Sequence, residues 1–316
     1  MEQGYKRAIN LTLQERRLWL AGLLAALALS EAWWVVFGWG PQYLGERWER
    51  AVGELLGEAA AFAAFVLAAL AAFVVLKALG YLGEMVLVRQ VADGEVNGVP
   101  TFADAFSTSR HRYLPFAVTL LPYDALFVAA IYLPAVFVPL WDRWDPRLDQ
   151  VLLYLLVMLV WFALFLAVYS LGGITAALAA RFTLIRGSGL PEAWQEGWGL
   201  FRANPGRCLA VWLQVLLAEI IFFVIAWPLS ALLPWGAEQL ADPIGFAPLR
   251  WLIYVVAYAI LVGGLIIMQT GVMCFKSSLW TLTYLELEEE AARKEAMLHP
   301  QPDWFPEPPS DFMPPG

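Results

Sequence analysis

The sequence predicts an all-α integral membrane protein with six transmembrane helices arranged as three hairpins. The chain has 316 residues, of which 60% are hydrophobic and 15% charged, whereas soluble domains are less apolar and more charged. Six stretches are long enough to cross a hydrocarbon layer of about 30 Å as helices of about 20 residues each. Three of these stretches carry one acid near their middle, which indicates that the helices share a protein interior.

The six predicted spans alternate in direction and are joined by short segments. They are Leu18–Trp39, Ala59–Val88, Leu114–Leu140, Val151–Ala180, Cys208–Leu233 and Pro248–Tyr284. Several are longer than a single crossing requires, so we expect their ends to project beyond the lipid or the helices to tilt. The first span follows a basic start, as a signal peptide would, but its apolar region is too long for one and predicts a retained helix.

The distribution of lysine and arginine predicts the orientation. Only five arginines fall in the outer loops, namely Arg47, Arg50, Arg143, Arg147 and Arg250. Most of the others lie in segments on the side of the N-terminus. By the positive-inside rule, both termini are therefore predicted to be cytoplasmic, in the inner cell membrane.

The acid-bearing spans resemble one another. Aligned on Glu31, Asp124 and Glu219, each has an aliphatic run before the acid, an aromatic-rich run after it, and a proline nine or ten residues later. Two explanations are open, a threefold internal duplication or a chance likeness of hydrophobic composition. A duplication would give units of about 1–90, 91–186 and 187–285, which together form the transmembrane domain 1–285.

Two inner connections show helical spacing of apolar residues. Phe102, Ala105 and Phe106 follow the second span, and Leu190 and Trp194 follow the fourth, with Trp198 one turn later. Both predict short amphipathic helices lying in the headgroup plane with their apolar faces down. Four arginines are then candidates for contact with lipid phosphates: Arg110, Arg112, Arg202 and Arg207.

Residues 286–316 predict a cytoplasmic helix end followed by a proline-rich tail. The prolines of this tail are Pro300, Pro302, Pro306, Pro308, Pro309, Pro314 and Pro315. Because proline interrupts both helices and sheet ladders, the tail should be extended. Two alternatives are open, a disordered tail or a docking segment laid along a partner.

The three acids, with Lys77, form the candidate buried polar site. Counting the rise per residue places Glu31 and Asp124 near the bilayer centre, where a carboxyl either protonates or finds a cation. Lys77 lies at a similar depth to Glu31 and is its predicted partner. No lysine is expected beside Asp124 or Glu219, and Lys276 is predicted to extend toward the headgroups.

Three interpretations of these acids are open. Each carboxyl can be hydrogen-bonded between helices and specify packing, it can serve protonation, ion passage or ligand binding, or it can face lipid or lie at the boundary of the bilayer. The candidate hydrogen-bonding partners are Tyr123, Tyr169, Gln214, Gln269 and Thr270.

The absence of several sequence motifs argues against catalysis. Histidine occurs only at positions 111 and 299, and the chain has no HExxH, CxxC, GxSxG or Walker sequence. We therefore predict that the protein is not an enzyme and that it has no metal site and no cofactor. The negative net charge gives no indication of nucleic-acid binding.

The segment RGSGLPEAWQEGWGLFRANPGRCLAVWLQVLL carries a resemblance. An inner-face helix of the type Ala-x-x-x-x-Trp-x-Leu-x-Arg before a spanning helix is approximated by Ala193, Trp198, Leu200 and Arg202. The chain in this respect resembles bacterial multi-pass proteins grouped with the glycerophosphoryl diester phosphodiesterase membrane-domain family. The resemblance implies a membrane-embedded fold and no catalytic residue, since the chain has no room for the hydrolase domain.

Two functions are consistent with these observations. The first is a non-enzymatic scaffold or accessory subunit that contacts partners or lipid headgroups at the cytoplasmic face, with membrane lipids, another membrane protein or a second copy as partner. The second is a transporter or lipid-handling protein whose acids line a cavity. A transporter predicts acids open to water, whereas a scaffold predicts acids sealed by neighbouring side chains and a broad apolar flank.

Overall fold

The computed structural model describes residues 2–29, 58–126, 148–244 and 246–298, which are almost entirely helical and contain no strand. The elements are α1 (Glu2–Gln14), α2 (Arg16–Leu29), α4 (Glu58–Asn97), α5 (Phe102–Ser109), the 3-10 turn η1 (Arg110–Arg112), a helix over residues 113–126, α7 (Leu148–Ala167), the π-helical turn η2 (Val168–Gly172), α8 (Gly173–Arg181), the π-helical turn η3 (Phe182–Arg186), α9 (Leu190–Ala203), α10 (Pro205–Ala241) and α11 (Ala247–Leu298).

Four helices in the described residues are long and apolar enough to cross a membrane: Ala71–Glu95, Leu156–Arg186, Pro205–Ala241 and Pro248–Leu298. The described residues are thus helical as predicted, and these four helices, which have the length and composition of membrane spans, overlap the second, fourth, fifth and sixth predicted spans. Parts of the first and third predicted spans, residues 30–39 and 127–140, lie outside the described residues, as do Glu31 and the tail 299–316.

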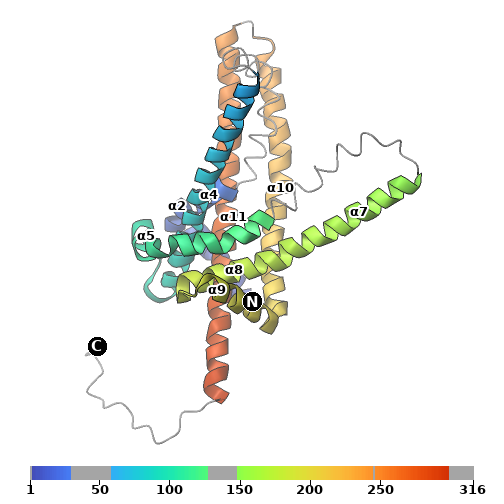
Figure 1. Ribbon diagram of the computed structural model, residues 1–316. Helices are drawn as coiled ribbons and strands as arrows, with labels where there is room; N and C mark the ends of the chain where they lie inside the picture. Colours follow the sequence, from blue (N-terminus) through green and yellow to red (C-terminus); the bar gives the residue numbers. More distant parts are fainter. Residues whose placement is uncertain (1, 30–57, 127–147, 245, 299–316) are drawn as a thin grey trace, which may run out of the picture.

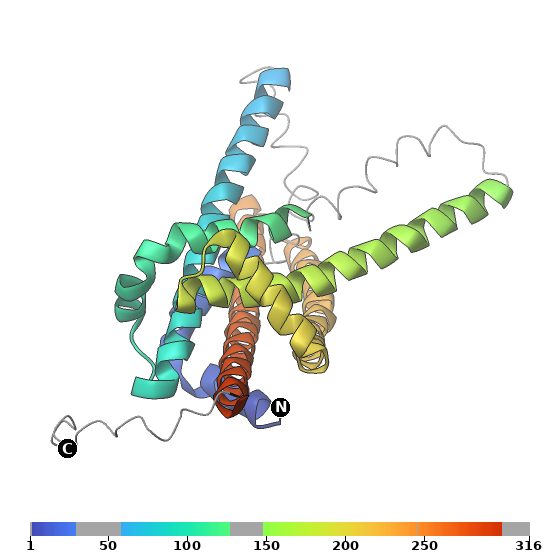
Figure 2. The same cartoon turned by 60° about the horizontal axis from the view of Figure 1, so that its bottom comes forward.

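α10 and α11 lie along a common direction and form an antiparallel hairpin (Figure 1). α4 contacts α11 and is inclined to it, so that its N-terminal half leans away from the hairpin (Figure 2). α7 leaves the other helices obliquely and continues into α8 through η2. α5, the 113–126 helix and α9 lie around one end of this assembly (Figure 2).

The 113–126 helix crosses α4 instead of running beside it, as both views show (Figures 1 and 2). Near its start, the Tyr113 hydroxyl donates to the Ala78 carbonyl oxygen at 2.8 Å. Near its end, Asp124 accepts from Lys77 at 2.9 Å. The two ends of a segment about 16 Å long therefore contact adjacent residues of α4.

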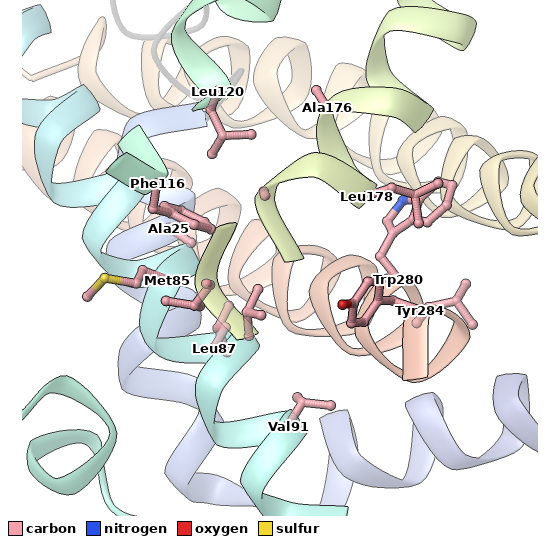
Figure 3. Close-up of a cluster of buried hydrophobic side chains, with 14 of the residues drawn as sticks. Ala25, Met85, Leu87, Val91, Phe116, Leu120, Ala176, Leu178, Trp280 and Tyr284 are labelled. Carbon is pink, nitrogen blue, oxygen red and sulfur yellow. The ribbon is translucent and has the colours of Figure 1, made fainter. Parts of the chain in front are cut away.

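In α4 and α11 the exposed apolar side chains are more frequent toward one end and the packed ones toward the other. In α4, Phe73 and Val75 are exposed, whereas Met85 and Val88 are fully buried. Most of the buried apolar residues belong to one cluster that draws side chains from α1, α2, α4, α5, the 113–126 helix, α8, η3, α9, α10 and α11 (Figure 3). A second, smaller cluster of Phe222, Ala226, Leu261 and Leu265 joins α10 to α11. The exposed side chains form the apolar surface that lipid requires, and the packed ones form the core.

Small residues allow the core helices to approach closely. A Cβ atom at Gly83 of α4 would lie 2.3 Å from the backbone nitrogen of Ala25 in α2. A Cβ at Gly22 would lie 2.3 Å from the sulfur of Cys274 in α11, and a Cβ at Gly197 would lie 3.0 Å from the backbone nitrogen of Ala179. Glycine thus brings helices together at three contacts.

The two predicted interfacial helices form but pack on the protein. Ala105 of α5 is buried, and Phe102 and Phe106 pack against the core cluster, so this apolar face is covered by protein. In α9 the buried stripe is Ala193, Gly197 and Phe201, which differs from the predicted stripe. α9 packs on α8, and the absence of a side chain at Gly197 allows the α8 backbone to approach.

Candidate functional site

The first polar group of the core joins α4 to the 113–126 helix. Lys77 Nζ donates to Asp124 Oδ2 at 2.9 Å, and the Tyr81 hydroxyl donates to the same oxygen at 2.5 Å. Lys77 and Tyr81 are four residues apart, so one face of α4 presents both. The side chains of Lys77 and Asp124 are largely buried, and the two donors compensate the carboxylate for the water it has lost.

The second polar group has the same composition and joins α10, α11 and η2. Lys276 Nζ donates to Glu219 Oε1 at 2.9 Å, and the Tyr169 hydroxyl donates to Glu219 Oε2. Tyr169 lies on the π-helical turn between α7 and α8. Such turns are often found at functional sites.

Tyr123 lies between the two groups. It precedes Asp124 in the chain, and its ring and hydroxyl contact the backbone at Gly172 and Gly173, where a Cβ would lie 3.3 and 3.1 Å away. Its phenol is within electrostatic reach of Asp124, Glu219 and Lys276. We call Lys77, Tyr81, Asp124, Tyr169, Glu219 and Lys276 the polar belt.

The polar belt corrects three sequence expectations. The prediction that no lysine would lie beside Asp124 or Glu219 is wrong, because Lys77 pairs with the first and Lys276 with the second. Lys276 therefore turns toward a carboxylate and does not extend toward the headgroups. Because the carboxylate compensates the ammonium charge, a lysine in such a pair can stay buried without extending to water. Glu31, the predicted partner of Lys77, lies outside the described residues.

The residues that bind the two acids occupy equivalent positions in the second and fourth predicted spans. The interval from Lys77 to Arg89 equals the interval from Tyr169 to Arg181. Lys77 and Tyr169 each bind an acid of the following unit, Asp124 in one case and Glu219 in the other. Of the predicted hydrogen-bonding partners, Tyr169 is thus confirmed. The equal spacing was present in the sequence as a signal.

Sequence reasoning missed a third ion pair in the core. Arg181 of α8 is 1% exposed and lies 3.6 Å from the carboxylate of Glu84 in α4. The guanidinium also donates to the carbonyl oxygens of Ala177 and Ser277, at 2.9 and 3.4 Å. Glu84 lies seven residues after Lys77 on the same face of α4, which is the signal that could have found it.

The four candidate headgroup arginines divide into two kinds. Arg112 donates to the Thr183 carbonyl oxygen at 3.1 Å, and Arg207 pairs with Glu290 of α11 at 2.6 Å. Both thus hold protein groups, although Arg207 is partly exposed. Arg110 and Arg202 are exposed.

Each half of the polar belt pairs one lysine with one carboxylate, so that the charges cancel, and each pair links two helices. Within the described ranges, no group of three histidine, cysteine or acidic side chains is arranged to hold a metal ion. Comparison with protein-family models, curated proteins and solved structures found no match to the chain. The resemblance to the membrane-domain family therefore stays a prediction.

Proposed function

We propose that this chain is a non-enzymatic, multi-pass protein of the inner cell membrane that acts as a scaffold or accessory subunit. In this proposal both termini lie in the cytoplasm. It contacts partner proteins or lipid headgroups at the cytoplasmic face.

One observation carries the proposal: each acid of the polar belt is held between a lysine and a tyrosine. Asp124 is bound by Lys77 and Tyr81, and Glu219 is bound by Lys276 and Tyr169. Carboxylates with two donors each are satisfied by the protein itself, which suits a structural role.

The exposed surface of α7 supports a partner-binding role. Its apolar side chains lie largely outside the core, as Leu159 and Phe162 do, and the helix diverges from the other long helices (Figure 1). A contiguous apolar flank of this kind suits a membrane-embedded protein partner.

A photo-reactive amino acid at Leu159 or Phe162 tests this role in native membranes. The scaffold proposal expects a discrete cross-linked protein band, whereas lipid contact alone leaves the mass nearly unchanged on a gel. The matched control is Leu67 of α4, which is similarly exposed. Equal behaviour of α7 and Leu67, without a discrete band, would contradict the proposal.

The second candidate is a transporter or lipid-handling protein, and the position of Tyr169 on a π-helical turn favours it. Purified protein in vesicles with a trapped pH-sensitive dye separates the two. The scaffold expects proton flux no faster than in empty vesicles and a loss of thermal stability in Glu219→Gln. Flux that Glu219→Gln abolishes at unchanged stability would establish the second candidate instead.

A further inference from the structure

The 113–126 helix has one face that is exposed and wholly apolar. The exposed residues recur at helical spacing and are Leu114, Pro115, Val118, Leu121, Pro122, Ala125 and Leu126. Leu114, Val118 and Leu121 are 70%, 38% and 55% exposed. The polar residues of the helix, Thr119 and Asp124, turn toward the protein instead.

An exposed apolar stripe of this kind is stable against lipid acyl chains and unfavourable in water. The orientation of the helix relative to the predicted spans indicates how it would lie in the membrane. The helix crosses α4, with Tyr113 and Asp124 contacting the adjacent residues Ala78 and Lys77. In both views the helix also lies across the direction of α10 and α11, which have the length and composition of spans (Figures 1 and 2). A helix that crosses such spans lies along the membrane plane.

Residue counts along α4 and α11 give the depth of the polar belt, and of the 113–126 helix beside it, relative to the hydrocarbon layer. On α4 the helix begins at Glu58 and reaches Lys77 after 19 residues, and on α11 Trp251 and Lys276 are 25 residues apart. At the rise per residue of an α-helix, these separations correspond to about 28 and 38 Å. The hydrocarbon layer is about 30 Å thick, and about 40–45 Å with its headgroup regions.

We propose that the 113–126 helix lies in the plane of the membrane. Its exposed face, which carries Leu114, Val118 and Leu121, contacts the acyl chains of the leaflet nearer to the buried core cluster. The polar belt then marks the edge of the hydrocarbon layer and not its centre. The exposed Arg110, one turn before Leu114, lies where a lipid phosphate is available to it. The exposed apolar side chains of α4, α10 and α11 continue the same lipid contact.

The depth of spin labels in vesicles tests the orientation. Leu114→Cys, Val118→Cys and Leu121→Cys are labelled in the full chain, reconstituted in vesicles of phosphatidylcholine and phosphatidylglycerol. Collision rates with oxygen and with a water-soluble nickel chelate then give the depth of each label. The native Cys208 and Cys274 are buried, so the unsubstituted protein measures background labelling.

An in-plane helix predicts equal depths at 114 and 121, with all three labels more accessible to oxygen than to nickel. A spanning helix would give a difference of about 10 Å over these seven residues. Leu67→Cys and Val74→Cys on α4 are the matched control, since they are also seven residues apart and exposed. Because α4 spans the layer, the two control labels should show this full difference in depth.

Two results would overturn the proposal: a depth step at 114–121 equal to that of the α4 control, or high nickel accessibility at all three positions. The first would make the segment a spanning helix, and the second would place it in water. Neither result bears on cross-linking at α7, so failure of this inference is distinct from failure of the scaffold proposal.

Discussion

Lys276 Nζ lies 2.9 Å from Glu219 Oε1 and joins α11 to α10, the two helices of the antiparallel hairpin. The same relationship recurs between Lys77 and Asp124, also at 2.9 Å. In both pairs the lysine lies in the part of its helix where exposed apolar side chains give way to the core. A charged pair at this position fixes the register of two helices, because sliding by one turn would leave both charges unpaired in an apolar setting.

Removing the cation of this pair should destabilise the protein. In Lys276→Met, Glu219 keeps only Tyr169 as a donor and must protonate or remain charged without its counter-ion. We expect a loss of about 2–3 kcal/mol in the free energy of unfolding, which is less than the roughly 3–5 kcal/mol of a fully buried pair, since a third of the Lys276 side chain is exposed. Thermal denaturation in mild detergent measures it.

The double variant Lys276→Met with Glu219→Met separates pairing from packing. Replacing both charges by apolar groups of similar size should recover most of the lost stability. Lys294→Met, on the exposed end of the same helix, is the control and should change little. Lys276→Met as stable as the parent would mean that the pair contributes nothing.

The tyrosine of the first group should contribute through its hydroxyl alone. Tyr81→Phe keeps the ring and removes the donor to Asp124. A hydrogen bond to a charged group contributes about 1.5–3 kcal/mol, although hydrogen bonds between membrane helices average about 0.6 kcal/mol. We therefore expect a loss of about 1 kcal/mol in denaturation experiments. Tyr5→Phe, at an exposed position of α1, serves as the control, and an equal effect of both variants would exclude a specific role for the Tyr81 hydroxyl.

The sequence was sufficient to predict helices where apolar runs are long enough to cross a membrane, as in α4, α10 and α11. It could not predict which side chains of a run are exposed and which lie in the core. Phe73 and Met85 of α4 are both apolar, yet one is exposed and the other buried. Lipid and protein interior select the same side chains, so composition does not distinguish them.

The candidate site was predictable in its residues but not in its pairings. Lys77, Asp124 and Glu219 stand out because a charge within an apolar run is costly. Which lysine binds which acid depends on how the helices pack. Counting residues to estimate depth assumes that the helices are parallel, whereas the 113–126 helix crosses α4. The same kind of count predicts that Lys276 extends toward the headgroups, although its partner lies on the adjacent α10.

Close backbone contact between α2 and α4 predicts a strong effect at Gly83. In Gly83→Ala, the new Cβ would lie 2.3 Å from the Ala25 nitrogen and 2.5 Å from the Ala21 carbonyl oxygen. Backbone atoms cannot turn aside, so the helices must separate, and we expect a loss of at least about 2 kcal/mol. Gly263→Ala in α11 meets no atom within 4 Å and should be neutral or stabilising by up to about 1 kcal/mol. Similar melting temperatures for the two variants would contradict the packing.

The two cysteines should react with a membrane-permeant maleimide only after unfolding. Both Cys208 and Cys274 have no exposed surface, and the Cys274 sulfur lies 3.5 Å from the Leu18 carbonyl oxygen, at the contact of α2 with α11. Mass spectrometry of the native protein should show little adduct, and two adducts after denaturation.

Two variants make this labelling specific to the contact of α2 with α11. Leu209→Cys, one residue beyond Cys208 on the exposed side of α10, controls for access of the reagent and should give one adduct in the native protein. Gly22→Ala, whose Cβ would lie 2.3 Å from the Cys274 sulfur, should displace α2 and increase the reaction of Cys274 but not of Cys208. Rapid labelling of Cys274 in the native parent protein would mean that α2 does not cover α11 there.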